Sequence, residues 1–193
     1  AWEAATGTQV HEALGMSECS TFVSGSPARP APPGATGYPQ AGRTLAVLGE
    51  DDRPVPRGIP GTLAVHAADP GLMLGYLGAP EETEARVAGD WFVTGDTVTM
   101  AHDTAVAYLG RTDDMMNAGG VRVSPLEVEA ALAEHPGIDE IACAEVEVKA
   151  DTTVIAAFYT GPAPLREDDL AAFAAARLAR YKQPRFYEHR SSL

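Results

Sequence analysis

Cysteine is scarce in this chain: Cys19 and Cys143 are the only two among 193 residues, and they stand far apart. Neither has a cysteine or histidine neighbour at metal-ligand spacing, and the five histidines are scattered. We therefore expect structural or surface histidines rather than metal ligands. Two isolated thiols indicate a reducing compartment, so we expect a cytoplasmic protein. A disulfide between the two cysteines is the alternative that the sequence leaves open.

Basic residues are also few, with 14 Lys and Arg against 27 Asp and Glu, which leaves a net charge of −13. A chain this acidic repels nucleic-acid phosphates and anionic lipids, so we expect neither as a partner. No apolar run approaches the ~20 residues that a membrane-spanning helix needs. The N-terminus lacks the basic and apolar regions of a signal peptide. It also lacks an initiator methionine, from which we expect that the chain begins within a longer protein.

The length leaves room for one large domain or two small ones. A strand is predicted at residues 8–14, and residues 24–42, rich in Pro, Gly and Ser, are predicted to form a long surface loop. Short apolar runs at 44–48 and 61–65 alternate with turn residues in the stretch that ends near residue 100. This spacing predicts short strands in a small β-barrel or sandwich.

After Gly110 the pattern changes to helices and strands. Ser124, Pro125 and Glu127 form a capping box, which predicts a helix that ends at Pro136. We expect one face of this helix to be apolar, formed by Val128, Ala131, Leu132 and His135.

Two strands are predicted within 138–159, around a turn at 149–151, and an apolar stripe then predicts a second helix. The members of the stripe are Leu170, Phe173, Ala174, Leu178 and Tyr181. We therefore expect an α+β protein, with a mostly β part at 1–110 and a smaller α+β part at 111–193.

Three short segments carry side chains that suit nucleotide chemistry. In the first, Ser17 can donate to a phosphate oxygen, and the carboxylate of Glu18 can hold Mg²⁺ against a triphosphate. Gly15 before them lets the backbone pass close to a ligand. In the second, Thr94-Gly95-Asp96, the two oxygens of the Asp96 carboxylate can accept from a vicinal diol. Each segment taken alone is more typical of an ordinary turn.

The third segment runs from Gly110 to Glu129 and concentrates special backbone chemistry. Arg111 provides a permanent cation with a rigid fork of donors. Asp113 follows in an acidic pair, and Gly119 and Gly120 form a glycine loop before the capped helix. A surface salt bridge and a β-turn are the simpler interpretations of the arginine and the glycines.

In this order, the three segments resemble motifs of the acyl-adenylate-forming enzymes, the superfamily of acyl-CoA synthetases, adenylation domains and luciferases. Two more stretches are similar to the family. The strand at 61–65 followed by Gly75-Tyr76-Leu77 resembles its "GEL-x-V…GY" segment, and residues 180–185 resemble its "YK-x-P" segment. Five ordered matches extend the resemblance over essentially the whole chain.

The resemblance implies a site for ATP, Mg²⁺ and coenzyme A. Nucleotide contacts are implied for Leu14, Gly15, Ser17, Glu18, Asp96 and Arg111, with Leu14 against the adenine, Glu18 on the metal, and Asp96 and Arg111 on the ribose. Asp113 corresponds to the hinge about which the small C-terminal domain rotates. Gly119 and Gly120 correspond to the loop that lines the pantetheine tunnel.

Parts of the family pattern are missing from the sequence. The phosphate-binding loop and most of the acyl pocket lie upstream in the family, and its catalytic Lys follows the "YK-x-P" segment, beyond Leu193. The resemblance thus implies the C-terminal portion of a synthetase: 1–110 as a β-barrel or sheet remnant of the large domain, and 111–193 as the mobile lid. We expect the chain alone to be inactive, with the missing N-terminal region of the same protein as a partner and a homo-oligomer as an option.

The leading hypothesis is a carboxylate–CoA ligase that forms an acyl-adenylate from ATP and a carboxylic acid and passes the acyl group to CoA. One alternative is an adenylation domain that loads a carrier protein. The other is a non-catalytic nucleotide-binding module.

Overall fold

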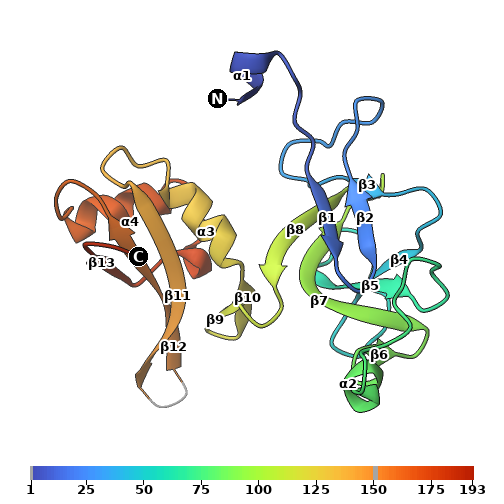
Figure 1. Cartoon of the computed structure of the whole chain (residues 1–193). Coiled ribbons are helices and arrows are strands. Elements are labelled where there is room, and N and C mark those ends of the chain that lie inside the picture. Colours follow the sequence, from blue (N-terminus) through green and yellow to red (C-terminus); the bar gives the residue numbers. More distant parts are fainter. Residues whose placement is uncertain (1, 150–151) are drawn as a thin grey trace. The chain divides into compact units, whose positions relative to one another are not determined.

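The computed structural model describes residues 2–149 and 152–193, and its chain divides into two compact units. The first unit ends at Thr112, and the second begins at Asp113. In Figure 1 the first runs from blue to yellow-green, and the second from yellow to red. Each unit has its own hydrophobic core.

The first unit opens with the short helix α1 (Trp2–Thr6) and a small antiparallel sheet of β1 (Ala13–Met16), β2 (Ser20–Ser24) and β3 (Tyr38–Pro39). The strand predicted at 8–14 thus begins only at Ala13. The predicted loop at 24–42 contains little regular structure beyond β3. This segment has many Pro and Gly residues, which favour irregular backbone over a sheet ladder.

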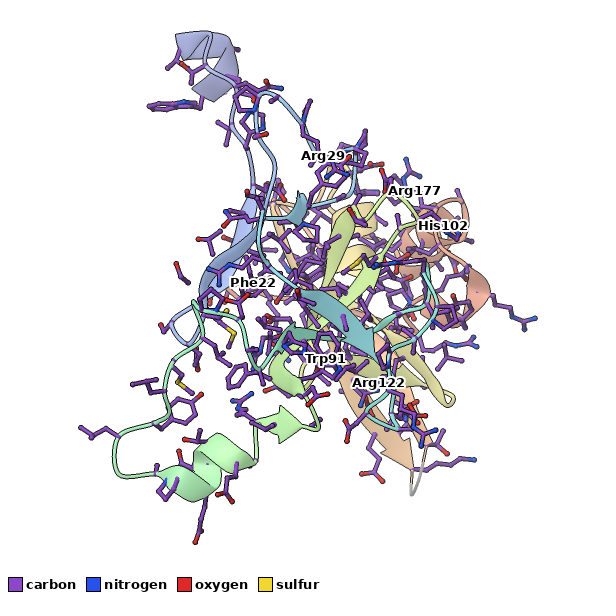
Figure 2. All side chains as sticks on the ribbon, turned by 90° about the vertical axis from the view of Figure 1, so that its right-hand side faces the viewer. Phe22, Arg29, Trp91, His102, Arg122 and Arg177 are labelled. Carbon is purple, nitrogen blue, oxygen red and sulfur yellow. The ribbon has the colours of Figure 1, made fainter. Side chains whose placement is uncertain are left out.

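A second sheet makes up the rest of the first unit. Its order is β4 (Leu45–Leu48), β5 (Gly61–His66), β7 (Trp91–Met100) and β6 (Val87–Ala88), and β8 (Val106–Arg111) also pairs with β7. The short helix α2 (Pro80–Glu84) precedes β6. Both apolar runs predicted as strands therefore form β4 and β5. Their buried side chains join Phe22, labelled in Figure 2, in the core of the unit.

The class is α+β, as expected. The sequence suggested a small β-barrel or sandwich. The described strands form several separate sheets and no closed barrel. A barrel needs every strand to be paired on both sides, whereas β4 and β6 are the ends of their sheet.

The second unit begins with a hairpin of β9 (Met116–Ala118) and β10 (Val121–Val123). The helix α3 (Pro125–Leu132) follows, and then the long antiparallel strands β11 (Glu140–Lys149) and β12 (Thr152–Thr160). After α4 (Glu167–Ala175) and the 3-10 turn η1 (Arg180–Lys182), β13 (Phe186–His189) adds to β12 in parallel. Residues 150–151 of the predicted turn lie outside the described residues.

Both helices of this unit pack on its sheet. Val128 and Leu132 of α3 and Ala174 of α4 share a buried cluster with Cys143 of β11 and Ile155 of β12. None of the helices within 2–149 and 152–193 is long and apolar enough to cross a lipid bilayer.

The capping box at the start of α3 is confirmed, because the Ser124 side chain accepts from the Glu127 N–H. The predicted end is too late, since the helix stops at Leu132. Pro136 disfavours the helical conformation at His135, and the His135 ring instead packs edge-on against Phe173, with centroids 4.9 Å apart.

The second predicted helix also ends early, at Ala175. Leu178 is buried just beyond the helix, and Tyr181 falls in η1, where it is 49% exposed. The apolar spacing continues past the helix because a loop residue can fill the same core.

Candidate functional site

Asp96 and Arg111 form an ion pair between neighbouring strands of the first unit. They are direct partners in the β7–β8 register, and Arg111 Nη1 lies 3.2 Å from Asp96 Oδ1. The same Nη1 donates to the Thr94 carbonyl oxygen at 3.3 Å. The Asp96 side chain is 9% exposed and that of Arg111 40%. A nearly buried carboxylate is therefore held beside a guanidinium that still reaches solvent.

Gly95 lets this pair sit close to the backbone. Its φ is +80°, and a Cβ placed there would come within 2.8 Å of Arg111 Nη2 and 3.3 Å of Arg86 Nη1. Any larger residue would combine an unfavourable left-handed backbone with a clash. Two guanidinium groups thus lie over one glycine.

Glu18 occupies the tight turn between β1 and β2, next to the exposed Ser17. Its Oε1 accepts a hydrogen bond of 2.6 Å from the Tyr76 hydroxyl, and its carbonyl oxygen accepts from the Met73 N–H at 2.7 Å. The hydrogen bond from Tyr76 is the main cause that holds the pKa of Glu18 below its ordinary value, against the opposing effect of burial. Arg86 and Arg111 lower this pKa further.

Glu18, Asp96 and Arg111 therefore share one electrostatic neighbourhood, although they come from distant parts of the first unit. Arg111 connects them, because it forms the ion pair with Asp96 and its positive charge also lowers the pKa of Glu18. The sequence did not single out Arg86 or give Tyr76 a role in the site. The only feature of the sequence that could have pointed to Arg86 is that it is a single basic residue within an acidic stretch.

Leu14 and Gly15 lie on β1, and the structure gives both a role in packing. Leu14 is half-buried against the core of the unit. Gly15 sits at a β-bulge, where a Cβ would come within 2.7 Å of the Ser20 carbonyl oxygen. The close approach of β2 thus requires a glycine whether or not a ligand is bound.

The remaining predicted residues lie in the second unit. Asp113 is exposed in a turn, and Gly119 and Gly120 are the two central residues of the β9–β10 hairpin. Their φ values of +61° and +86° match the hairpin turn that requires positive φ at both positions. Gly119 also lines an open groove of about 510 Å³, together with Arg180 and Arg185.

Glu18 fits a magnesium ion that arrives with a nucleotide. The described residues contain no group of three or more His, Cys, Asp or Glu arranged to hold a metal by themselves. Mg²⁺ is commonly bound by one or two carboxylates together with substrate phosphates. The second oxygen of Glu18, Oε2, makes no hydrogen bond with the part of the chain that the structure describes.

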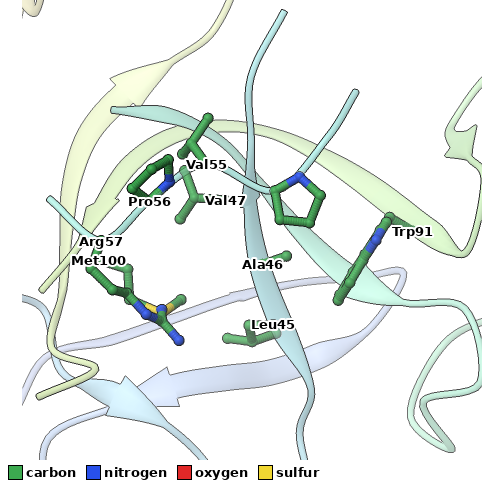
Figure 3. A pocket seen from close by; sticks show the side chains of 9 residues that line it. Leu45, Ala46, Val47, Val55, Pro56, Arg57, Trp91 and Met100 are labelled. Carbon is green, nitrogen blue, oxygen red and sulfur yellow. The ribbon is translucent and has the colours of Figure 1, made fainter. Parts of the chain in front are cut away.

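A further groove, of about 280 Å³, lies beside β4 and is shown in Figure 3. Its lining is mostly apolar and includes Leu45, Val55 and Trp91. It contains none of the residues predicted to bind the nucleotide.

Two family profiles match the chain. The one described as AMP-binding enzyme matches residues 1–77, and the one described as AMP-binding enzyme C-terminal domain matches residues 127–193. A long-chain-fatty-acid–CoA ligase of Escherichia coli O6:H1 is 31% identical over 194 residues, covering 100% of this chain and 34% of the ligase.

Solved structures give the same result. ATP-bound MatB from Rhodopseudomonas palustris is similar with a TM-score of 0.88 and 30% identity, over 100% of this chain and 39% of MatB. O-succinylbenzoate coenzyme A synthetase (MenE) from Bacillus subtilis, in complex with ATP and a magnesium ion, has a TM-score of 0.84 and 26% identity, over 99% of this chain and 40% of MenE.

The fold and these matches define the class as adenylate-forming enzymes. The chain belongs to the AMP-binding enzyme family, and its relatives there are acyl-CoA ligases. It spans about a third of the length of the curated relatives it matches, such as 34% of the Escherichia coli ligase.

Proposed function

We propose that the chain is part of an ATP-dependent acid–CoA ligase, which joins a carboxylic acid to AMP and then transfers the acyl group to CoA. The observation that carries the proposal is the Asp96–Arg111 ion pair in the same neighbourhood as Glu18. A carboxylate and a guanidinium lie next to each other there. A nucleotide carries both hydroxyl groups and phosphates, and it therefore requires side chains of both kinds.

In the adenylation step, the Asp96 carboxylate would accept hydrogen bonds from the ribose hydroxyls, and Arg111 would donate to the same sugar. Ser17 would donate to a phosphate oxygen, and Leu14 and Gly15 would border the adenine. Glu18 would hold the magnesium ion, which neutralises charge on the phosphates. The two arginines over Gly95 add positive charge in a chain whose net charge is −13.

In the second step, we propose that the part from residue 111 onward rotates about Asp113 as a lid on the part that ends at residue 110. Acyl-adenylates hydrolyse readily, so one lid position would enclose the adenylate and the other would admit the thiol. The Gly119–Gly120 turn would then border the pantetheine arm. The groove beside it carries Arg180 and Arg185, which suit an anionic ligand.

The test uses the full-length protein that contains this chain. Pyrophosphate release is measured with ATP and a panel of carboxylic acids, and thioester formation is then measured after CoA is added. We expect release that requires an acid, followed by thioester formation. ATP binding without turnover would instead identify a nucleotide-binding module, and transfer to a carrier protein but not to CoA would identify an adenylation domain. Residues 1–193 alone are expected to release no pyrophosphate.

A further inference from the structure

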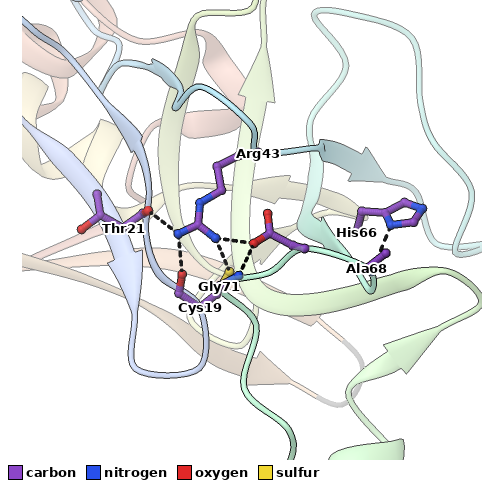
Figure 4. Close-up of polar contacts among 7 residues, drawn as sticks. Cys19, Thr21, Arg43, His66, Ala68 and Gly71 are labelled. Carbon is purple, nitrogen blue, oxygen red and sulfur yellow. Dashed lines mark hydrogen bonds and ion pairs between the residues drawn. The ribbon is translucent and has the colours of Figure 1, made fainter.

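Arg43 forms an ion pair with Asp69, and the hydrogen bonds of its guanidinium are drawn in Figure 4. The Asp69 side chain is fully buried, and that of Arg43 is 15% exposed. Arg43 also donates to the carbonyl oxygens of Cys19, at 3.2 Å, and Thr21, at 3.1 Å. One guanidinium therefore binds the backbone directly after Glu18.

The other partner of this pair organises a different segment. Asp69 Oδ1 also accepts from the Gly71 N–H at 2.8 Å, which fixes the start of the loop that leads to Tyr76. The Tyr76 N–H in turn donates to Thr83 Oγ1 at 2.9 Å. The loop from 69 to 76 is thus anchored at both ends.

This loop holds Glu18 at two points. The Met73 N–H donates to the Glu18 carbonyl oxygen, and the Tyr76 hydroxyl donates to the Glu18 carboxylate. Because Tyr76 uses only Oε1, the other oxygen remains available for a cation. Tyr76 therefore restrains the carboxylate directly, and the Arg43–Asp69 ion pair restrains the backbone next to it.

A buried ion pair is weak evidence for stability, because desolvation of both charges offsets their attraction. Here the cost is not fully compensated, since Asp69 Oδ2 is buried and has no hydrogen-bond partner within the described residues. The geometrical effect of the pair is more informative: it joins the two segments that carry Glu18 and Tyr76.

We propose that Tyr76 is a positioning residue that orients the Glu18 carboxylate toward the magnesium–nucleotide complex, and that the Arg43–Asp69 pair holds Tyr76 in place. The inference rests on the proposed function. Tyr76, Arg86 and Arg111 are the charged or titratable groups that affect Glu18 from the elements around it. Of these, Tyr76 is the one whose hydroxyl touches the carboxylate.

The test is Tyr76→Phe in the full-length protein, which removes the hydroxyl and keeps the ring. Hydrogen bonds to charged groups are strong enough that we expect about a tenfold higher Mg²⁺ concentration for half-maximal pyrophosphate release. The affinity for a non-hydrolysable ATP analogue, measured by isothermal titration calorimetry at low Mg²⁺, should fall by a similar factor.

Tyr38→Phe is the matched control, because Tyr38 is a half-buried tyrosine of the same unit whose hydroxyl makes no hydrogen bond within the described residues. It should leave the Mg²⁺ requirement and the affinity for the ATP analogue unchanged. Normal values for Tyr76→Phe, in an enzyme that still releases pyrophosphate, would overturn the positioning role alone. A wild type that does not release pyrophosphate would overturn the proposed function, and this inference with it.

Asp69→Asn tests the second half of the proposal, because it keeps the shape of the side chain and removes its charge. We expect it to raise the Mg²⁺ requirement in the same direction as Tyr76→Phe. In the double variant, the two effects should combine to less than their product, since they act on one carboxylate. Independent, multiplicative effects would show that the ion pair does not act through Tyr76.

Discussion

Asp96 is nearly buried, yet its carboxylate is charged and forms an ion pair with the partly exposed guanidinium of Arg111. A buried charge is costly unless it is paired and hydrogen-bonded, and the Arg111 guanidinium provides this pairing. The register of β7 and β8 places the two residues directly opposite each other. A ligand that inserts hydroxyl groups at this position would therefore meet an acceptor that is already fixed.

The first prediction concerns Asp96→Asn, which keeps the size of the side chain and removes its charge. If the carboxylate binds the ribose, the affinity for AMP should fall at least about tenfold, as expected for hydrogen bonds to a charged group. Isothermal titration calorimetry of the full-length protein measures it. Asp90→Asn, at an exposed position before β7, is the control and should bind AMP normally. Equal AMP affinity of Asp96→Asn and Asp90→Asn would contradict the proposed contact of Asp96 with the ribose.

A second prediction concerns Cys143, whose thiol pKa is raised by burial, and also by Glu129, to about 12 from 9.0. Below pH 9 the thiol is neutral in both the folded and the unfolded state, so its ionisation does not change the free energy of unfolding. Between pH 9 and 12 the unfolded state releases a proton that the folded state retains. The free energy of unfolding should therefore fall as the pH rises through this window.

Urea denaturation at pH 8 and pH 10.5 measures this effect. The midpoint of the wild type should be lower at pH 10.5, and the drop should be smaller in Cys143→Ala. A residual drop is expected, because burial also raises the pKa of Tyr187 to about 12. The same pH dependence in both proteins would contradict a raised pKa of the Cys143 thiol in the folded state.

At the scale of elements, the sequence predicted what local chemistry determines. The buried runs of β4 and β5 and the start of α3 follow from short-range patterns, namely apolar clusters and a capping box. The ends of α3 and α4 were missed because tertiary packing sets them. His135 leaves its helix to pack on Phe173, and Leu178 fills the core from outside a helix.

The same distinction applies to the site. Family resemblance pointed to Glu18, Asp96 and Arg111, because their motifs are local. Tyr76 stands 58 residues from the carboxylate that it contacts. A contact between residues so far apart leaves no pattern in the sequence, so only the structure could reveal it.

The β9–β10 hairpin yields the third prediction. Gly120→Ala places a side chain at a φ of +86°, which costs roughly 1–2 kcal/mol for a residue other than glycine. If this turn borders the pantetheine arm, thioester formation should slow while acid-dependent pyrophosphate release is retained.

Gly58→Ala is a matched control, because Gly58 also has a φ of +86° and open space around its Cβ. It should cost similar stability and leave both half-reactions intact. Equal loss of both half-reactions in Gly120→Ala would indicate a structural role for the turn.

At the scale of the whole molecule, the chain divides into two compact units between Thr112 and Asp113. The proposed rotation would take place at this division. The fourth prediction is that Asp113→Pro spares adenylate formation and strongly reduces thioester formation, because proline fixes φ near −65° and restricts rotation. Single-turnover assays of each half-reaction measure the two steps separately. Asp113→Ala removes the same charge without restricting the backbone, and it should retain both steps. A parallel loss of both in Asp113→Pro would contradict the hinge.

The pairing of Arg43 with Asp69 also has an evolutionary consequence. Loss of the arginine would leave the buried Asp69 carboxylate without a counter-charge, and loss of the aspartate would do the same to the guanidinium of Arg43. Either single change should therefore be disfavoured. Natural variants should therefore keep both residues or exchange both for neutral ones. Covariation between positions 43 and 69 is thus expected in related proteins, although neither residue lies in a segment that resembles a motif of the family.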